Sequence, residues 1–299
     1  MPRITLEQWR ALRAVVDHGG YAQAAEALHK SQSSVTYAIQ KLESLLAVRA
    51  FEVQGRKAVL TEAGKALYRR AGRLLDEAEA LERSAVDLAA GWEAEIGIAV
   101  EGLYPTWLML RCLDLFGHEA PHTRIELFET VLTGTQEALL EGRAQLAIAA
   151  TIPGGFSADP LMRVRFLAVA HPGHPLHRAG RQLTHADLRG HRQLVTRDSA
   201  SVQRRDAGWL DAEMRWTVSN PSTSIGAVCR GYGFAWFPED KIQTELAEGV
   251  LKPLPLREGA EKFAELYLVI ARPDDAGPGI RRLADIIRQE TAARCSARG

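Results

Sequence analysis

Apolar residues recur at helical spacing in successive stretches at the start of the chain. The first stretch follows Thr5, which with Gln8 fits a capping box, and it ends at Gly19-Gly20. Its apolar stripe consists of Leu6, Trp9, Leu12 and Val16. The second stretch, Tyr21 to Leu28, is rich in alanine, whose small side chain lets another helix approach closely. The pattern predicts two short helices that pack together.

A third helix is predicted to begin at Ser31 or Ser33 and to bury one face. Its apolar positions are Val35, Ile39, Leu42 and Leu46. The same periodicity turns a set of mostly short polar side chains outward, namely Gln32, Ser33, Ser34, Thr36, Tyr37, Gln40 and Lys41. Such side chains can hydrogen-bond to base edges in a major groove. We therefore predict a helix-turn-helix whose second helix binds DNA through these residues.

A two-stranded ribbon is predicted next, with strands Phe51 to Val53 and Ala58 to Leu60. Its tip carries Arg56 and Lys57. Cations at such a tip can contact phosphates, and each contact adds about 0.9 to the magnitude of the salt slope of DNA binding. A solvated hairpin would show the same pattern, but the helices before it favour a wing. Residues 1–61 are thus predicted to form a winged helix-turn-helix domain.

A long helix is predicted from Glu62 to Ala90, with a length of about 43 Å. Its apolar positions alternate in steps of four and three residues: Leu67, Ala71, Leu74, Ala78, Leu81, Ala85 and Leu88. A helix on the surface of a globular domain would drift off so strict a heptad repeat. We therefore expect residues 62–91 to form a linker that pairs with the same helix of a second copy.

Short apolar runs alternate with amphipathic stretches in the remaining two thirds of the chain. The expected strands are 96–100, 124–128, 145–149, 165–170, 193–195, 215–218, 234–237 and 266–271. The expected helices are 105–116, 133–141, 224–230 and 280–294. Strands that alternate with helices form a mainly parallel sheet, and the carboxyl ends of its strands border a ligand cleft. The pattern predicts two α/β subdomains.

Composition and charge are those of a folded protein with a basic N-terminal module. The 299 residues exceed what one core usually covers, and 46% of them are hydrophobic and 25% charged. No apolar run approaches the roughly 20 residues of a membrane helix, and no secretory core precedes residue 16, so a cytoplasmic protein without a membrane partner is expected. Residues 1–73 carry a net charge of +6, which favours a nucleic acid partner.

Residues that could suggest an enzyme or a metal site lack the necessary pattern. His171, His174 and His177 are three apart, but Pro172 and Pro175 interrupt any helix that would bring the rings together. Residues 196–199 contain a carboxylate, a guanidinium and two hydroxyls but no nucleophile elbow, and no Walker or dinucleotide motif occurs. We therefore expect no catalytic residue, no metal and no cofactor.

The N-terminal motifs resemble those of the LysR-type transcriptional regulators. The resemblance is carried by the alanine-rich second helix, by Ser-Gln-Ser-Ser-Val-Thr from Ser31, and by Leu-Thr-Glu-Ala-Gly from Leu60. It implies a homodimer or homotetramer that binds an inverted repeat in double-stranded promoter DNA and contacts RNA polymerase. Where the family usually has Gly, Leu and Arg, this chain has Ala47, Ala50 and Val53. That arginine is a backbone anchor in the family, so Arg49, Arg56 and Lys57 are expected to carry more of the positioning.

A weaker resemblance covers the second half of the chain. It rests on Glu141-Gly142, on His-Pro-Gly-His-Pro at 171–175, and on Gly231-Tyr232-Gly233 before Pro238. It implies two α/β subdomains like the periplasmic-binding-protein type II fold, with an effector between them. The strands that cross between the subdomains are expected near 163–166 and 266–270. Subdomain I then comprises 92–163 and 269–299, and subdomain II comprises 164–268.

The effector cleft is expected at loops that follow strands. Its candidate residues are Glu101, Gly102, Leu103, Tyr104, Leu132, Thr133, Thr196, Arg197, Ser199, Asn220, Ser222 and Trp236. The family often holds a carboxylate with Ser or Thr near positions 103 and 132, and here leucines replace them, so an acidic effector is less favoured. Arg197 is the expected partner of any anionic group. The alternative is that Leu103 and Leu132 fill the cleft and leave a regulator without a ligand.

The sequence thus predicts a DNA-binding transcriptional regulator controlled by a small-molecule effector. Two alternatives remain open. One is a regulator of the same architecture that senses thiol oxidation through Cys112 and Cys229, although no neighbouring residue predicts a reactive thiolate and no spacing of Cys112, Cys229 and Cys295 suggests a disulfide framework. The other is a cytosolic enzyme with an N-terminal dimerisation module.

Overall fold

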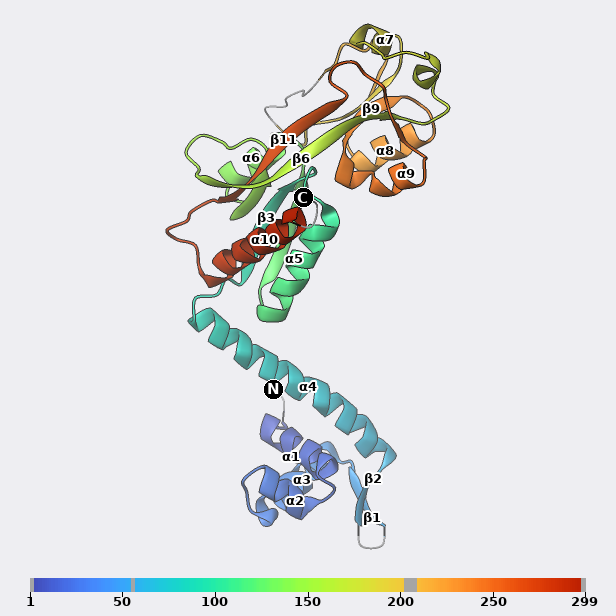
Figure 1. The fold of residues 1–299 in the computed structure, drawn as a ribbon. Helices are drawn as coiled ribbons and strands as arrows, with labels where there is room; N and C mark the ends of the chain where they lie inside the picture. The colour runs from blue at the N-terminus through green and yellow to red at the C-terminus, as the bar shows by residue number, and fades with distance from the viewer. Residues whose placement is uncertain (1–2, 55–56, 202–208, 297–299) are drawn as a thin grey trace. The chain divides into compact units, whose positions relative to one another are not determined.

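The computed structural model describes residues 3–54, 57–201 and 209–296. The chain folds as two compact units, Met1–Ala90 and Gly91–Gly299. The first unit consists of α1 (Leu6–Asp17), α2 (Tyr21–Ala27), α3 (Gln32–Leu46), β1 (Phe51–Gln54), β2 (Lys57–Leu60) and α4 (Glu62–Ala89) (Figure 1). The predicted helices and ribbon are confirmed, with boundaries that differ only slightly.

Local sequence explains where the first helices begin. The capping box is present, since Gln8 N donates to Thr5 Oγ1 at 3.3 Å and Thr5 N donates to Gln8 Oε1 at 2.9 Å. Ser31 caps α3 and accepts from Ser34 N at 3.2 Å. The predicted apolar face of α3 is buried at Val35, Ile39 and Leu42, and only Leu46 is half-buried. Capping and periodicity together therefore fix which face of α3 remains in solvent.

The ribbon is fastened to the helices by two short polar networks. Glu43 Oε1 accepts from Ala50 N at 2.7 Å and from Phe51 N at 3.1 Å, which ties the first strand to α3. Thr61 Oγ1 accepts from Gly64 N at 2.9 Å and so caps α4. A Cβ at Gly64 would lie 2.0 Å from Ala50 O, so only glycine permits this approach. These contacts explain the Leu-Thr-Glu-Ala-Gly motif physically.

Ala47 occupies a backbone conformation that favours glycine. It ends α3 with φ 52° and ψ 38°, in the left-handed region, where an L side chain costs roughly 1–2 kcal/mol. Ala47→Gly should therefore stabilise the first unit by about 1 kcal/mol, measured by hydrogen exchange of amides in α1 to α3. The control Ala66→Gly, at an exposed position inside α4, should destabilise by about 1 kcal/mol. Faster exchange in Ala47→Gly would contradict the strain.

The apolar seam of α4 divides between two roles. Ala71 is buried and Leu67 half-buried, and both belong to the core of the first unit, where α4 contacts α1. Leu75, which lies outside the seam, is buried as well. Leu74 and Leu81, by contrast, are 46% and 72% exposed. The expectation that the whole seam faces a partner helix is therefore corrected for its first two positions, because α1 covers them. Leu74, Leu81 and Ala85 of the seam therefore remain available for pairing.

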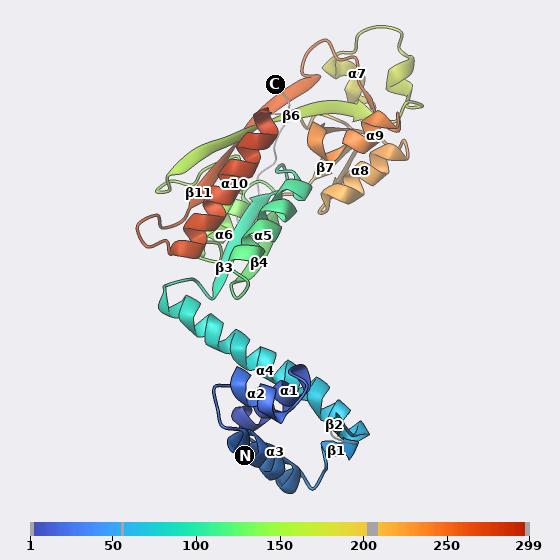
Figure 2. The same cartoon turned by 60° about the horizontal axis from the view of Figure 1, so that its bottom comes forward.

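The second unit is built on one mixed sheet. Its strands are β3 (Glu95–Glu101), β4 (Arg124–Thr130), β5 (Leu146–Ala149), β6 (Ala158–Ala170), β7 (Gln193–Thr196), β8 (Arg215–Val218), β9 (Phe234–Pro238), β10 (Lys252–Pro253) and β11 (Glu261–Ile270). The strand order is β4-β3-β5-β11-β6-β9-β7-β8, with β10 beside β6. Helices α5 (Thr106–Glu119), α6 (Gly134–Leu140), α7 (His185–Arg189), α8 (Pro221–Cys229), α9 (Gln243–Ala247) and α10 (Pro278–Ser296) cover it (Figure 2).

Two long antiparallel strands, β6 and β11, run through both halves of this sheet (Figure 1). The first half contains β3, β4 and β5, and the second contains β7, β8 and β9. They pair from Ala158 with Val269 to Leu167 with Glu261, and the register shifts once, between Leu266 and Tyr267. Both strands are longer than expected: β6 begins before 165, and β11 before 266. The sequence missed these extensions because charged residues alternate with apolar ones there, as in 261–265, and the predicted runs included only the continuous apolar parts.

The two halves have separate apolar cores. In the first, α5 and α10 lie side by side over β3 and β5, around Phe116, Ile148 and Leu283. In the second, clusters form on both faces of β6 and β9, around Val169 and Phe234. The chain enters the second half through β6 and returns to the first through β11.

Among the described residues no helix is long and apolar enough to cross a membrane.

Candidate functional site

The outer face of α3 is polar and largely free for a partner. Gln32, Ser33, Ser34, Gln40 and Lys41 are exposed, as expected. Tyr37 is 64% exposed, and Lys41 Nζ lies 5.9 Å from the centre of its ring. Tyr37 and Gln40 thus present a ring and an amide side by side in solvent.

Three hydroxyls of α3 are partly committed to the helix itself. Thr36 is half-buried, and its Oγ1 donates to Gln32 O at 2.9 Å. Ser33 and Ser34 hydroxyls lie 2.9 and 2.8 Å from Ser31 Oγ at the helix N-terminus. These residues would have to exchange an internal hydrogen bond for one to a base. Tyr37, Gln40 and Gln32 are therefore the stronger candidates for reading bases.

A basic groove beside α3 was not anticipated. It is lined by Arg3, Arg10, Lys30 and Lys41 together with Tyr37. Periodicity alone did not reveal it, because these cations come from different elements. Of the predicted wing cations, Arg56 lies outside the described residues, and of Lys57 only the backbone, in β2, is described. Arg49 is exposed next to the wing.

A cavity of about 420 Å³ lies between the two halves of the second unit. Six of the predicted cleft residues line it: Glu101, Gly102, Leu103, Leu132, Thr196 and Trp236. Leu103 and Leu132 form part of the cavity wall but do not fill the cavity. The alternative of a filled cleft therefore does not describe this structure. Leu132 has a positive φ of 54°, a strained backbone of the kind that concentrates at ligand sites.

The other six predicted residues do not line the cavity. Tyr104 is buried in the core, and its hydroxyl lies 2.7 Å from Thr291 Oγ1, because α5 begins there and turns the ring inward. Asn220 caps α8 by accepting from Ser222 N at 2.9 Å. Arg197 is exposed outside the cavity, which corrects its expected role as partner of an anionic group. Thr133 and Ser199 lie at the rim of the cavity, in the loops after β4 and β7, which hydrogen bonds connect.

Hydrogen bonds close the rim of the cavity between the two halves. Ser199 Oγ accepts from Val131 N at 2.8 Å, and Ser199 N donates to Val131 O at 3.2 Å. Thr133 Oγ1 donates to the buried Asp198 carboxylate. A Cβ at Gly134 would lie 1.9 Å from Ser199 Oγ, so a larger residue at this position would displace the Ser199 hydroxyl. The structure therefore represents a closed arrangement of the cleft.

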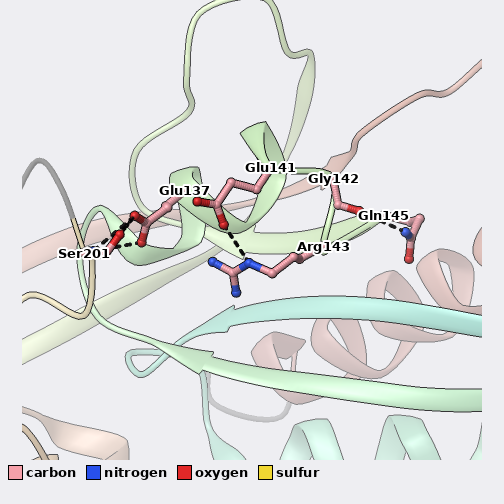
Figure 3. Close-up of polar contacts among 6 residues, drawn as sticks. All are labelled: Glu137, Glu141, Gly142, Arg143, Gln145 and Ser201. Carbon is pink, nitrogen blue, oxygen red and sulfur yellow. Dashed lines mark hydrogen bonds and ion pairs between the residues drawn. The ribbon is translucent and has the colours of Figure 1, made fainter.

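Farther along α6, Glu137 extends the same contact (Figure 3). Its carboxylate accepts from Ser201 N at 2.9 Å and from the Ser201 hydroxyl. Glu141 instead accepts from Arg143 Nε at 2.7 Å, and Gly142 ends the helix with φ 71°. The Glu141-Gly142 motif is thus a helix end, whereas Glu137 is the residue of α6 that reaches the other half.

Glu101 is a buried acid in the wall of the cavity. Its side chain is 3% exposed and accepts from Ala150 N at 2.6 Å. Burial raises its pKa to about 7, against the opposing effect of backbone N–H groups of Ala150 and Leu132, and the Asp198 charge adds to the rise. The carboxyl group therefore titrates near neutral pH inside the cleft.

The sequence missed most of the cavity wall. Aromatic and apolar side chains line it at Phe166, Leu194, Trp209, Ile225, Phe237 and Phe263, and two cations, Lys241 and Lys262, line it as well. Near Lys241, the side chains of Asp240 and Arg294 form a buried ion pair between the two halves. The lining residues come from β6, β7, β9, β11, α8 and the segments between them, and only long-range contacts bring them to one cleft.

The comparisons with known proteins agree with both units. Residues 6–65 match the family model of the bacterial regulatory helix-turn-helix protein, lysR family, and residues 89–292 match that of the LysR substrate binding domain. The chain belongs to the LysR family. It is accordingly a DNA-binding transcriptional regulator with a substrate-binding domain.

Two curated relatives and two solved structures each match at least 80% of the chain. The probable HTH-type transcriptional regulator YhaJ of Escherichia coli K12 is 30% identical over 280 residues, 92% of each chain. The uncharacterized HTH-type transcriptional regulator YeeY of the same strain is 30% identical over 246 residues, 80% of this chain and 79% of that one. CrgA from Neisseria meningitidis has the same fold, with a TM-score of 0.52, 22% identity and coverage of 95% and 98%. Full-length BenM gives 0.51, 23% and 98% of both chains.

The cysteines of this LysR protein do not favour thiol sensing. Cys112 lies buried in the first half, where burial raises its pKa to about 11. Cys229 lies in the second half, and burial raises its pKa too. A reactive thiol needs the opposite shift of its pKa.

Among the described residues no group of His, Cys, Asp or Glu could hold a metal ion. Of the three predicted histidines, His174 accepts a hydrogen bond at Nδ1 from Leu176 N in its own loop.

Proposed function

We propose that this regulator binds an inverted repeat in promoter DNA as a homo-oligomer and changes promoter activity when a small molecule enters the cleft of its second unit. The observation that carries the proposal is the cavity that spans both halves, closed by hydrogen bonds from Ser199 to Val131. A ligand that contacts both walls binds the closed form more tightly than an open one, and it therefore shifts the population toward closure.

The partners follow from the surfaces of the two units. The polar face of α3 binds promoter DNA, and the exposed half of the α4 seam pairs two copies into a homodimer, which can assemble further into a homotetramer. The proposal includes contact with RNA polymerase at the regulated promoter. The protein is proposed to act in the cytoplasm as a regulator and not as an enzyme, like the transcriptional regulators that it resembles.

Base recognition by α3 is tested with single substitutions. In DNA selected from a random pool by the wild-type protein, Gln32→Ala and Tyr37→Ala should each reduce discrimination by about 1–3 kcal/mol, because each removes a base contact. The measurement is a binding titration against the selected site and against single-base variants of it. Gln23→Ala, at an exposed position in α2, serves as the control. Unchanged preference in both variants would remove α3 from base reading.

A further inference from the structure

Lys262 lies on the face of the crossing strands that forms the cavity wall. The register places Lys262 opposite Phe166 and places Trp236 opposite Ala168, so Lys262, Phe166 and Trp236 share one face of the sheet. All three line the cavity. Lys262 Nζ lies 4.2 Å from the centre of the Trp236 ring. A cation is thus held against an aromatic wall inside the cleft.

This cation has no carboxylate partner among the residues the structure describes. On the opposite face of the same strands, Arg163 lies 3.5 Å from Glu265, and Arg165 pairs with Glu261. Lys262 has no such neighbour, and burial lowers its pKa. A half-buried ammonium without an ion pair is costly unless something anionic binds beside it. The contrast between the two faces therefore indicates a site for an anion.

A second lysine reaches the cavity from the other direction. Lys241 Nζ donates to Thr106 Oγ1 at 2.7 Å, which links the two halves. Asp240, the adjacent acid, forms its buried ion pair with Arg294. Among the described residues that line the cavity, the charged side chains are therefore two lysines and the carboxylate of Glu101, which backbone N–H groups already hold.

One neutral polar group in the wall also lacks a partner. Gln193 is 4% exposed, and its Nε2 donates to Trp209 O at 2.7 Å, which fixes the orientation of the amide. Its Oε1 is buried without a hydrogen-bond partner among the described residues. A buried acceptor left unpaired is unfavourable, and a donor on a ligand would satisfy it.

We infer that the cleft ligand is a planar aromatic compound with a carboxylate beside Lys262 and a hydroxyl or amine that donates to Gln193 Oε1. Phe166 and Trp236 provide the surfaces for its ring. The volume of about 420 Å³ lies in the usual range for small-molecule sites. The inference rests on the proposed function, since it names the chemical class of the effector. It also reverses the sequence expectation that an acidic effector is disfavoured.

The test uses hydroxybenzoates, hydroxyphenylacetates and hydroxyindole carboxylates, each beside its methyl ester, in calorimetric titrations of the full-length protein. At least one acid should bind more tightly than its ester by about tenfold or more, because a desolvated charged contact is strong. Lys262→Met should raise the Kd of that acid to about that of the ester, and Lys262→Arg should restore the preference. Lys252→Met, at an exposed position on β10, is the matched control and should bind like the wild type.

Equal binding of acid and ester by the wild type, or an acid preference that survives in Lys262→Met, would overturn the inference. So would a panel in which no acid binds. The proposed function fails by a different result: no compound from a broad metabolite library changes the affinity for the selected DNA. An uncharged compound that binds in the cleft and alters DNA affinity would preserve the proposed function and refute the ligand class.

Discussion

Leu74→Glu combined with Leu81→Glu should convert the oligomer of this regulator into smaller species. Both side chains are largely exposed on α4 and lie seven residues apart on the predicted seam. Pairing would bury two unpaired carboxylates in each copy, and each buried unpaired charge costs roughly 3–5 kcal/mol. A loss of that size exceeds the stability of most helix pairs. Sedimentation velocity of the full-length protein at micromolar concentration measures the change.

The matched control is Arg73→Glu combined with Arg83→Glu, which adds negative charge at exposed positions of α4 off the seam. That variant should sediment like the wild type, because its charges remain in solvent. Circular dichroism should show unchanged helix content in both variants, since neither touches the buried Ala71 and Leu75. If the seam variant kept the wild-type sedimentation coefficient, the second unit alone would have to hold the copies together.

The stability of the second unit should depend on pH through Glu101, and its free energy of unfolding should fall as pH rises. The pKa of Glu101 is raised by burial from 4.5 in the unfolded chain to about 7 in the folded one, so folding favours the protonated form. The contribution is complete below about pH 4.5 and is lost as pH rises through about 7. A difference of that size corresponds to about 3 kcal/mol.

Glu101→Gln should remove this pH dependence, since an amide does not titrate. The measurement is urea unfolding at a series of pH values, followed by tryptophan fluorescence, because five of the six tryptophans belong to residues 91–299. Glu95→Gln, on the exposed start of the same strand, is the control and should keep the wild-type slope. Parallel pH curves for the wild type and Glu101→Gln would show that Glu101 ionises normally.

Elements defined by local sequence were predictable. The capping box at Thr5 and the burial of Val35, Ile39 and Leu42 depend on neighbours within a few residues, so periodicity identified α1 and α3 and the face that α3 exposes. The heptad spacing of α4 was predictable, but α1 covers the first two seam positions, and pairing through the others stays a prediction. Sequence periodicity states which positions are apolar; it does not state whether α1 or a second copy covers them.

The cleft was predictable mainly where it follows strand ends. Leu103 and Leu132 come directly after β3 and β4, and the general rule for α/β sheets placed them correctly. Trp236, inside β9, was predicted as well. Lys262 was missed, because it belongs to β11, whose facing depends on pairing with β6, a partner about 100 residues away in the sequence. Tyr104 was misplaced for a related reason, because one residue beyond Leu103 the chain turns into α5 and the ring enters the core.

The continuous pairing of β6 with β11 determines how the cleft can open. Since both strands belong to both halves, separation of the rim must bend the sheet instead of swinging free domains. The single register shift, between Leu266 and Tyr267, lies where β11 passes from β6 alone to β5 as well. A bulged strand bends more readily than a regular one, because ladder hydrogen bonds are already interrupted there. A bend of the sheet should therefore be easiest at this position, midway along the strand that both halves share.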